Sequence, residues 1–165
     1  MAFKRYFALV LSFVATLFLD TAVLPKWNMF SIVPFLMLAF MLAAQQVFSL
    51  QGAIVIGIMG GLFEDLLCEN MIGLTPALLL LASVVYEKLP RDIDTKPIIL
   101  CLYCASLAFL VEFLRAFLSW IIGMRFGFLN VMLYGMLPRA LLTGIWFILY
   151  TAFLKPILKR QVDAI

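Results

Sequence analysis

The sequence has little charge and a large excess of apolar residues. Only 13% of its 165 residues are charged, while 66% are hydrophobic, and its mean hydropathy is +1.15. A soluble domain is about 45–50% apolar, so this composition excludes a water-soluble surface. Because one membrane-spanning helix needs about 20 apolar residues, six spans would use nearly the whole chain. No room is left for a soluble catalytic or nucleotide-binding domain, and the net charge of +3 does not indicate a nucleic-acid partner.

Histidine is absent and cysteine is scarce, which excludes further kinds of site. Without histidine we expect neither a metal site nor a histidine-based acid or base, and we expect no cofactor. The three cysteines Cys68, Cys101 and Cys104 are too few for a disulfide framework. Cys101 and Cys104 form a CxxC pair inside an apolar run, where we interpret them as small buried hydrophobic residues.

Long apolar runs separated by short polar segments dominate the rest of the chain. The first run follows Lys4 and Arg5, exceeds the length of a signal-peptide core and has no small-residue cleavage site, so we predict a retained span. The pattern predicts an all-α integral membrane protein, a six-transmembrane-helix bundle that forms a single transmembrane domain over residues 1–165. The predicted spans are residues 6–23, 32–48, 52–67, 75–88, 98–122 and 131–154.

Basic residues near the spans predict the orientation. With the N-terminus in the cytoplasm, eight of them fall inside: Lys4, Arg5, Lys88, Arg91, Lys96, Lys155, Lys159 and Arg160. Only Lys26 and Arg125 then fall outside. Since cytoplasmic loops carry the excess of lysine and arginine, we expect both termini inside.

Apart from Glu87 and Lys88 at the end of the fourth span, six charged residues lie within the predicted spans, where an ionisable group is expensive and marks a site or a pairing contact. They are Asp20, Glu64, Asp65, Glu112, Arg115 and Arg139. In the predicted topology all six lie at a similar depth, toward the non-cytoplasmic face. Glu112 and Arg115 are three residues apart, so we expect them to pair, and Arg139 would pair with Glu64 or Asp65. The cluster is either a structural ion-pair network, which we favour, or a site for a ligand or a partner's charged segment.

Two predicted spans have small residues at a spacing of four. Ala53, Gly57 and Gly61 follow this spacing in the third span, with Gly60 adjacent. The first span carries Ala8, Ser12, Thr16 and Asp20. Small residues allow helices to approach closely in lipid. These faces therefore either pack inside the bundle, which is the commoner case, or contact a partner helix; a dimer of this chain is one such arrangement.

Residues 57–74 read GIMGGLFEDLLCENMIGL, and this segment resembles the MreD family of bacterial rod shape-determining proteins. The family shows a glycine-containing third span, an Asp-Leu pair, a short turn and a Leu-Gly step into the fourth span. Asp65-Leu66 and Ile72-Gly73 resemble that pattern, as do Pro34 near the start of the second span and Pro138 in the sixth. The resemblance extends to the length of the chain and its basic tail.

This resemblance implies a non-enzymatic scaffold of the rod complex, or elongasome, in the bacterial inner membrane. Such a protein binds a single-pass MreC-like partner, with membrane lipid around both. Through MreC it acts with MreB, RodA and the RodA transpeptidase to help position peptidoglycan synthases and maintain cell shape. The family fold is similar to the substrate-binding subunit of energy-coupling-factor vitamin transporters. The alternative is therefore a solute-binding subunit of such a transporter, with an outward-facing pocket lined by the span charges.

Overall fold

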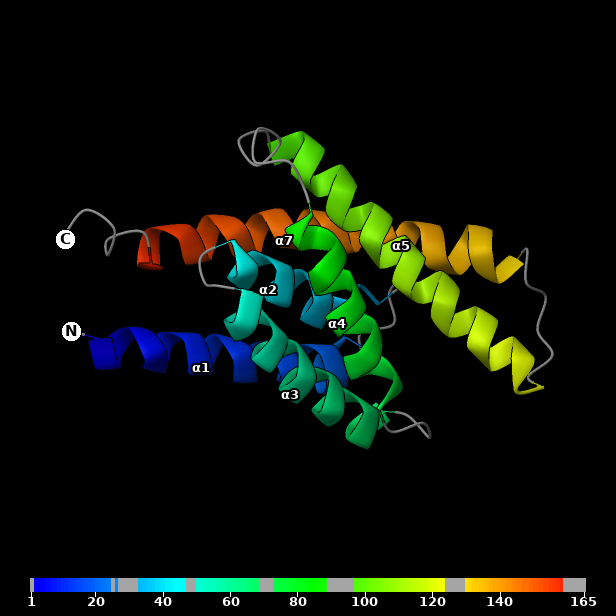
Figure 1. Cartoon of the computed structure of the whole chain (residues 1–165), viewed down its shortest axis with the longest axis horizontal. Coiled ribbons are helices and arrows are strands. Elements are labelled where there is room, and N and C mark those ends of the chain that lie inside the picture. Colours follow the sequence, from blue (N-terminus) through cyan, green and yellow to red (C-terminus); the bar gives the residue numbers. More distant parts are fainter. Residues whose placement is uncertain are drawn as a thin grey trace.

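The computed structural model describes residues 2–24, 26, 33–46, 50–68, 73–88, 97–123 and 130–158, and every regular element in these ranges is helical (Figure 1). The helices are α1 (Ala2–Phe18) with a π-helical extension η1 (Leu19–Val23), α2 (Leu36–Gln45), α3 (Leu50–Cys68), α4 (Leu74–Glu87), α5 (Pro97–Ile121), and the π-helical η3 (Val131–Met136) leading into α7 (Leu137–Leu158). The all-α prediction is confirmed. One helical segment corresponds to each predicted span, and the bounds differ by at most four residues.

The helices differ in their capacity to cross a membrane. Three stretches are long and apolar enough to do so: Leu50–Leu67, Pro97–Ile121 and Val131–Leu154. The other apolar helices are shorter, at Leu9–Val23, Leu36–Gln45 and Leu74–Glu87. With 10 residues, α2 rises only about 15 Å, half the thickness of a bilayer core of about 30 Å.

Helix α2 is the core of the bundle. Its residues from Leu36 to Ala44 are 0% exposed, and it contacts α1, α3, α4, α5 and α7. Figure 1 shows it in the middle of the molecule, between α3 and α7. A helix that is apolar on all sides must be enclosed by apolar neighbours, and here other helices supply them in place of lipid.

The glycine face of α3 packs against α2 and α4. A Cβ at Gly57 or Gly60 would meet Met41 or Met37 of α2. A Cβ at Gly61 would lie 2.7 Å from the backbone nitrogen of Pro76 in α4, and a backbone atom cannot move aside.

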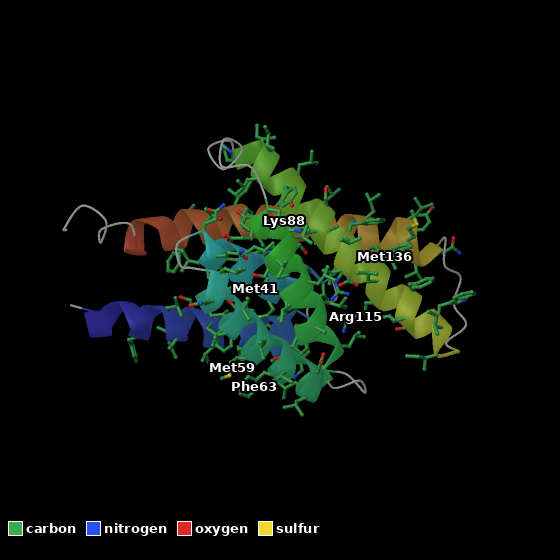
Figure 2. The ribbon with its side chains drawn as sticks, viewed as in Figure 1. Met41, Met59, Phe63, Lys88, Arg115 and Met136 are labelled. Carbon is green, nitrogen blue, oxygen red and sulfur yellow. The ribbon has the colours of Figure 1, made fainter. Side chains whose placement is uncertain are left out.

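Ala53, on the same face, is fully buried. Met59 and Phe63 point away from the bundle on the opposite flank of α3 (Figure 2). Of the two alternatives for this face, internal packing is therefore what the structure shows, and no surface is left there for a partner helix.

The small-residue stripe of α1 also faces inward. Thr16 Oγ1 donates to the Ser12 carbonyl at 2.8 Å and is 2.9 Å from the Tyr150 hydroxyl of α7, while Asp20 reaches α2. The side chain of Ala8 lies outside the described side chains. The opposite face of α1 is apolar and exposed: Phe7, Val10, Leu11, Val14 and Phe18.

Helices α5 and α7 pack through small residues that our sequence reasoning missed. A Cβ at Gly144 would lie 2.9 Å from the Cys101 carbonyl oxygen and 3.2 Å from the Ala105 Cβ. The prediction that the two cysteines are buried is confirmed for Cys104, which is fully buried, whereas Cys101 is partly exposed. The missed signal was the spacing of four in Ala140–Gly144 and Cys101–Ala105.

The two ends of the chain's described helices lie close together in the molecule. The start of α1 and the end of α7 lie at one end (Figure 1). The end of α5 and the start of η3 lie at the opposite end. Helices α1 and α7 run along the long axis of the molecule, and α3 and α5 cross it obliquely (Figure 1).

Candidate functional site

The six charged residues predicted to share one depth gather around the buried N-terminal end of α2. We call them the ionic cluster: Asp20 of η1, Glu64 and Asp65 of α3, Glu112 and Arg115 of α5, and Arg139 of α7. Glu64 interacts electrostatically with Asp20, Glu112 and both arginines. Arg115 also interacts with Asp65 and Asp20. Four helical segments that are far apart in sequence therefore bring their charges to one place.

Asp20 binds the N-terminal end of α2. Its Oδ2 accepts a hydrogen bond from the Met37 amide at 3.3 Å. The Phe35 amide donates to Thr143 Oγ1 of α7 at 2.9 Å, and that hydroxyl donates to the Arg139 carbonyl. The first amides of a helix have no partners within the helix, and its N-terminus attracts negative charge. Side chains of η1 and α7 thus complete a helix end that would otherwise be orphaned inside the bundle.

Asp65 caps α4. Its Oδ2 accepts hydrogen bonds from the Gly73 amide at 2.7 Å and the Thr75 amide at 3.2 Å. Gly73 has a φ of +99°, a left-handed conformation that glycine adopts without strain. The Asp65 and Gly73 positions that carry the family resemblance therefore build the connection from α3 to α4. Asp65 is engaged there, which corrects the expectation that it could pair with Arg139.

The ion pair in the cluster joins Glu112 and Arg139. Arg139 Nη1 lies 3.3 Å from Oε1 and 3.4 Å from Oε2 of Glu112. The predicted pairing of Arg139 with Glu64 or Asp65 was therefore wrong. Among the charged neighbours of Arg115, Glu64 acts on it most strongly. Spacing along one helix suggests Arg115 as the partner of Glu112, but the guanidinium within ion-pair distance of Glu112 is that of Arg139, which α7 supplies.

Several polar atoms of the cluster have no hydrogen-bond partner in the part of the chain that the structure describes. They are Glu64 Oε2, Asp65 Oδ1, Glu112 Oε1 and Arg139 Nε, and Thr75 Oγ1 of α4 is a further such atom. Glu64 is 7% exposed and Asp65 is 0% exposed, so bulk solvent does not compensate for these atoms. Buried polar atoms in proteins are nearly always paired, and several unpaired ones in one place need a reason. The cluster also has four carboxyls and only two guanidiniums.

One side of the cluster is open to its surroundings. The Arg139 side chain is 29% exposed, and Arg115 is half-buried. Figure 2 shows Arg115 between α4 and the second half of α5. The residues described contain no group of three acidic, cysteine or histidine side chains placed to hold a metal ion. The chemistry available here is binding of a charged or hydrogen-bonding group by fixed carboxylates and guanidiniums.

Both π-helical turns adjoin the cluster. In η1 the Leu24 amide donates to the Leu19 carbonyl at 2.9 Å, and Asp20 lies in that turn. The η3 turn ends three residues before Arg139, next to Pro138, whose ring nitrogen has no hydrogen to donate to the preceding turn. Such turns occur frequently at functional sites because they redirect a side chain within a helix.

A second polar group lies at the other end of α2, and our sequence reasoning did not treat it as a site. We call it the amide cluster: Gln45, Gln46, Ser83, Tyr86 and Glu87. Gln45 Nε2 donates to the Ser83 carbonyl and to Glu87 Oε2, and Ser83 Oγ donates to Gln45 Oε1 at 2.9 Å. Gln46 Nε2 donates to the Tyr86 hydroxyl at 2.8 Å. The signal available was two adjacent glutamines in an apolar run.

Comparison with known proteins identifies no relative: no family model, no curated protein and no solved structure matches this chain. The function must therefore be argued from the ionic cluster, the arrangement of the helices and the resemblance of residues 57–74. Among these, the ionic cluster is the feature that a purely structural role explains least, because its acceptors are buried and incompletely paired.

Proposed function

We propose that this protein is a non-enzymatic scaffold of the bacterial lateral wall elongation machinery, with six spans and both termini in the cytoplasm. The resemblance of residues 57–74 to the MreD family supports this, as does the excess of basic residues on the predicted inner side. The position of the start of α1 and the end of α7 at one end of the molecule supports an even number of crossings.

Impermeant thiol labelling would test this topology. Lys26 and Lys88 are exposed and fall on opposite predicted sides. In intact cells we expect a cysteine in place of Lys26 to react with an impermeant maleimide. A cysteine in place of Lys88 should react only after permeabilisation. The reverse pattern, or equal labelling, would reject the topology.

The ionic cluster carries the proposed binding role. Charges inside a membrane bundle are costly and usually belong to a functional contact. Here four helical segments contribute charges, and the carboxyls exceed the guanidiniums. A cluster that served only to hold helices together would be expected to satisfy its own acceptors, but Glu64 Oε2 and Asp65 Oδ1 have no partner within the described residues. A group supplied by another molecule would complete it.

We propose that the partner contacts this cluster, since both docking faces that we first considered are used inside the bundle. The glycine face of α3 and the polar stripe of α1, our two candidate docking faces, are used to pack α2, α4 and α7. The partner we propose is the single-pass MreC-like protein, and through it MreB, RodA and its transpeptidase.

Affinity purification in mild detergent, followed by mass spectrometry, tests the proposal. We expect the wild-type protein to recover an MreC-like single-pass protein. Arg139→Asp, which reverses a charge of the ionic cluster, should reduce that recovery. Glu87→Gln is the matched control, because it changes a charged residue of the amide cluster at the other end of α2. Equal recovery of the partner by all three proteins would show that the ionic cluster is not needed for partner binding.

The same experiment tests the solute-binding alternative, which the unpaired acceptors also favour. Recovery of a paired ATPase module with a transmembrane coupling subunit, and no MreC-like protein, would replace the scaffold proposal by the transporter one. A thermal shift of the purified protein with ring-containing metabolites would then identify the solute class.

A further inference from the structure

Glu64 differs from the other three carboxyls of the ionic cluster in what it binds. Asp20 accepts a backbone amide of α2, Asp65 accepts two backbone amides at the start of α4, and Glu112 pairs with Arg139. Glu64 Oε2 has no hydrogen-bond partner among the described residues, although Glu64 is only 7% exposed. It lies at the electrostatic centre of the cluster, where it interacts with Asp20, Glu112, Arg115 and Arg139.

The surroundings of Glu64 select the chemistry of the missing group. Asp20 and Glu112 repel the Glu64 carboxylate, and Arg115 and Arg139 attract it, but Arg139 is already paired with Glu112. Arg139 Nη1 contacts Glu112 at 3.3–3.4 Å, longer than the roughly 2.7–2.9 Å of a strong charge-assisted bond, so this pair does not neutralise the site tightly. An added group that donates hydrogen bonds and carries positive charge would fill the free acceptor and offset the excess of carboxyls. An anionic group would leave the acceptor without a donor and would increase the excess of negative charge.

We propose that Glu64 is the binding contact for a cationic nitrogen, the ammonium or guanidinium of a basic side chain carried by the partner's membrane helix. This inference rests on the proposed scaffold function, since it specifies what the partner presents to the cluster.

The depth of the cluster favours a side chain over a lipid amine. Glu64 lies four residues before the end of α3, or about 6 Å along the axis, and Glu112 lies nine residues before the end of α5, or about 14 Å. A lysine or arginine on a crossing helix reaches such depths and pairs there with buried acids. The amine of a lipid headgroup lies at the membrane surface, level with the helix ends.

Binding of synthetic transmembrane peptides to the purified protein in phosphatidylcholine nanodiscs tests the inference. The probe is a Leu/Ala-rich membrane-spanning peptide with one lysine placed between about 6 and 14 Å from its outer end; the matched peptide has methionine at that position. Affinity is measured by fluorescence energy transfer. Because a hydrogen bond to a charged group contributes about 1.5–3 kcal/mol, we expect the lysine peptide to bind the wild type about tenfold more tightly or better.

Two variants identify the residue responsible. Glu64→Gln keeps the shape of the side chain and removes its charge, so it should abolish the preference for lysine. Glu87→Gln, the same change in the amide cluster, should retain it. Equal affinity of the wild type for the two peptides, or a lysine preference that survives Glu64→Gln, would overturn the inference.

Further outcomes distinguish a lipid amine from a partner side chain as the bound group, and the Glu64 contact from the scaffold function. If the lysine preference is present in phosphatidylcholine but disappears in phosphatidylethanolamine, the lipid amine occupies the cluster, and the assignment to a partner side chain is overturned. Recovery of an MreC-like protein from membranes without any lysine preference would reject the Glu64 contact while supporting the scaffold. A lysine preference without recovery of such a partner would support the contact and reject the scaffold.

Discussion

The ionic cluster and the amide cluster lie at opposite ends of the same buried helix, α2, yet they are built differently. In the amide cluster, Gln45 and Ser83 hydrogen-bond to each other in both directions, and Gln45 also donates to the carboxylate of Glu87. In the ionic cluster, carboxyls outnumber guanidiniums, and Glu64 Oε2, Asp65 Oδ1 and Arg139 Nε have no hydrogen-bond partner in the described part of the chain.

From this difference we infer that the amide cluster holds the bundle together, and we propose that the ionic cluster binds another molecule. A neutral amide that meets its own partners connects two helices at little desolvation cost. Buried charges cost much more, and a pair of them often contributes little net stability. Their retention with unfilled acceptors is better explained by binding than by stability. Substitutions at four positions would test this contrast, and we expect their effects on the free energy of unfolding to decrease from Asp65 to Arg139, Gln45 and Glu64.

Removal of the α4 cap should have the largest effect. Asp65→Ala leaves the Gly73 and Thr75 amides without their acceptor, one of them buried. We expect a loss of about 2–4 kcal/mol in the free energy of unfolding. Unfolding of the purified protein in mixed micelles by dodecyl sulfate titration measures it. Asp65→Asn keeps an acceptor oxygen and should cost less than half as much; similar costs for the two variants would contradict the capping role.

Breaking the inter-helix ion pair should have the next largest effect. Arg139→Met leaves Glu112 buried without its cation, and because Arg139 is 29% exposed the cost should be about 1–3 kcal/mol, below that of a fully buried pair. Adding Glu112→Gln should recover part of this loss in the same unfolding assay. Adding Asp65→Asn to Arg139→Met should recover nothing, since Asp65 is engaged with backbone amides. If Asp65→Asn recovered stability and Glu112→Gln did not, the result would support the pairing of Arg139 with Asp65 that we first expected.

In the amide cluster, Gln45 and Ser83 should respond to substitution as a neutral pair that satisfies its own hydrogen bonds. Gln45→Leu leaves the buried Ser83 hydroxyl without its acceptor and should cost about 1–2 kcal/mol. The double variant Gln45→Leu, Ser83→Ala removes both partners and should be closer to the wild type than the single variant. Recovery of the MreC-like partner should not change in either protein. A loss of partner recovery with normal stability would mean that the amide cluster also binds.

Glu64→Gln should have the smallest effect on stability. The substitution removes no hydrogen bond from Oε2 and relieves repulsion with Asp20 and Glu112, while it loses attraction to the two arginines. We expect a change within about 0.5 kcal/mol, typical of a site that does not hold the fold together. Thermal unfolding in detergent checks this. A loss above about 2 kcal/mol would place Glu64 among the structural residues, with Asp65.

Parts of the site were predictable because charges are conspicuous in an apolar chain. Asp20, Glu64, Glu112 and Arg139 interrupt predicted spans, and their distances from the span ends placed them at one depth. Their partners were not predictable, because a partner depends on how each helix is rotated about its axis. Asp65 illustrates this: only the fold brings the Gly73 and Thr75 amides to its carboxyl and leaves Glu112 to Arg139.

The amino-acid sequence by itself determined that this protein is helical, apolar enough to span a membrane and built of six helical segments, because apolar runs of that length have few other stable forms. Only the tertiary structure decided that the second segment is the enclosed core and that the glycine face of α3 turns inward onto α2 and α4. The physical reason is that lipid and protein interior are similarly apolar. A helix such as α2 therefore has the same sequence pattern whether lipid or other helices surround it.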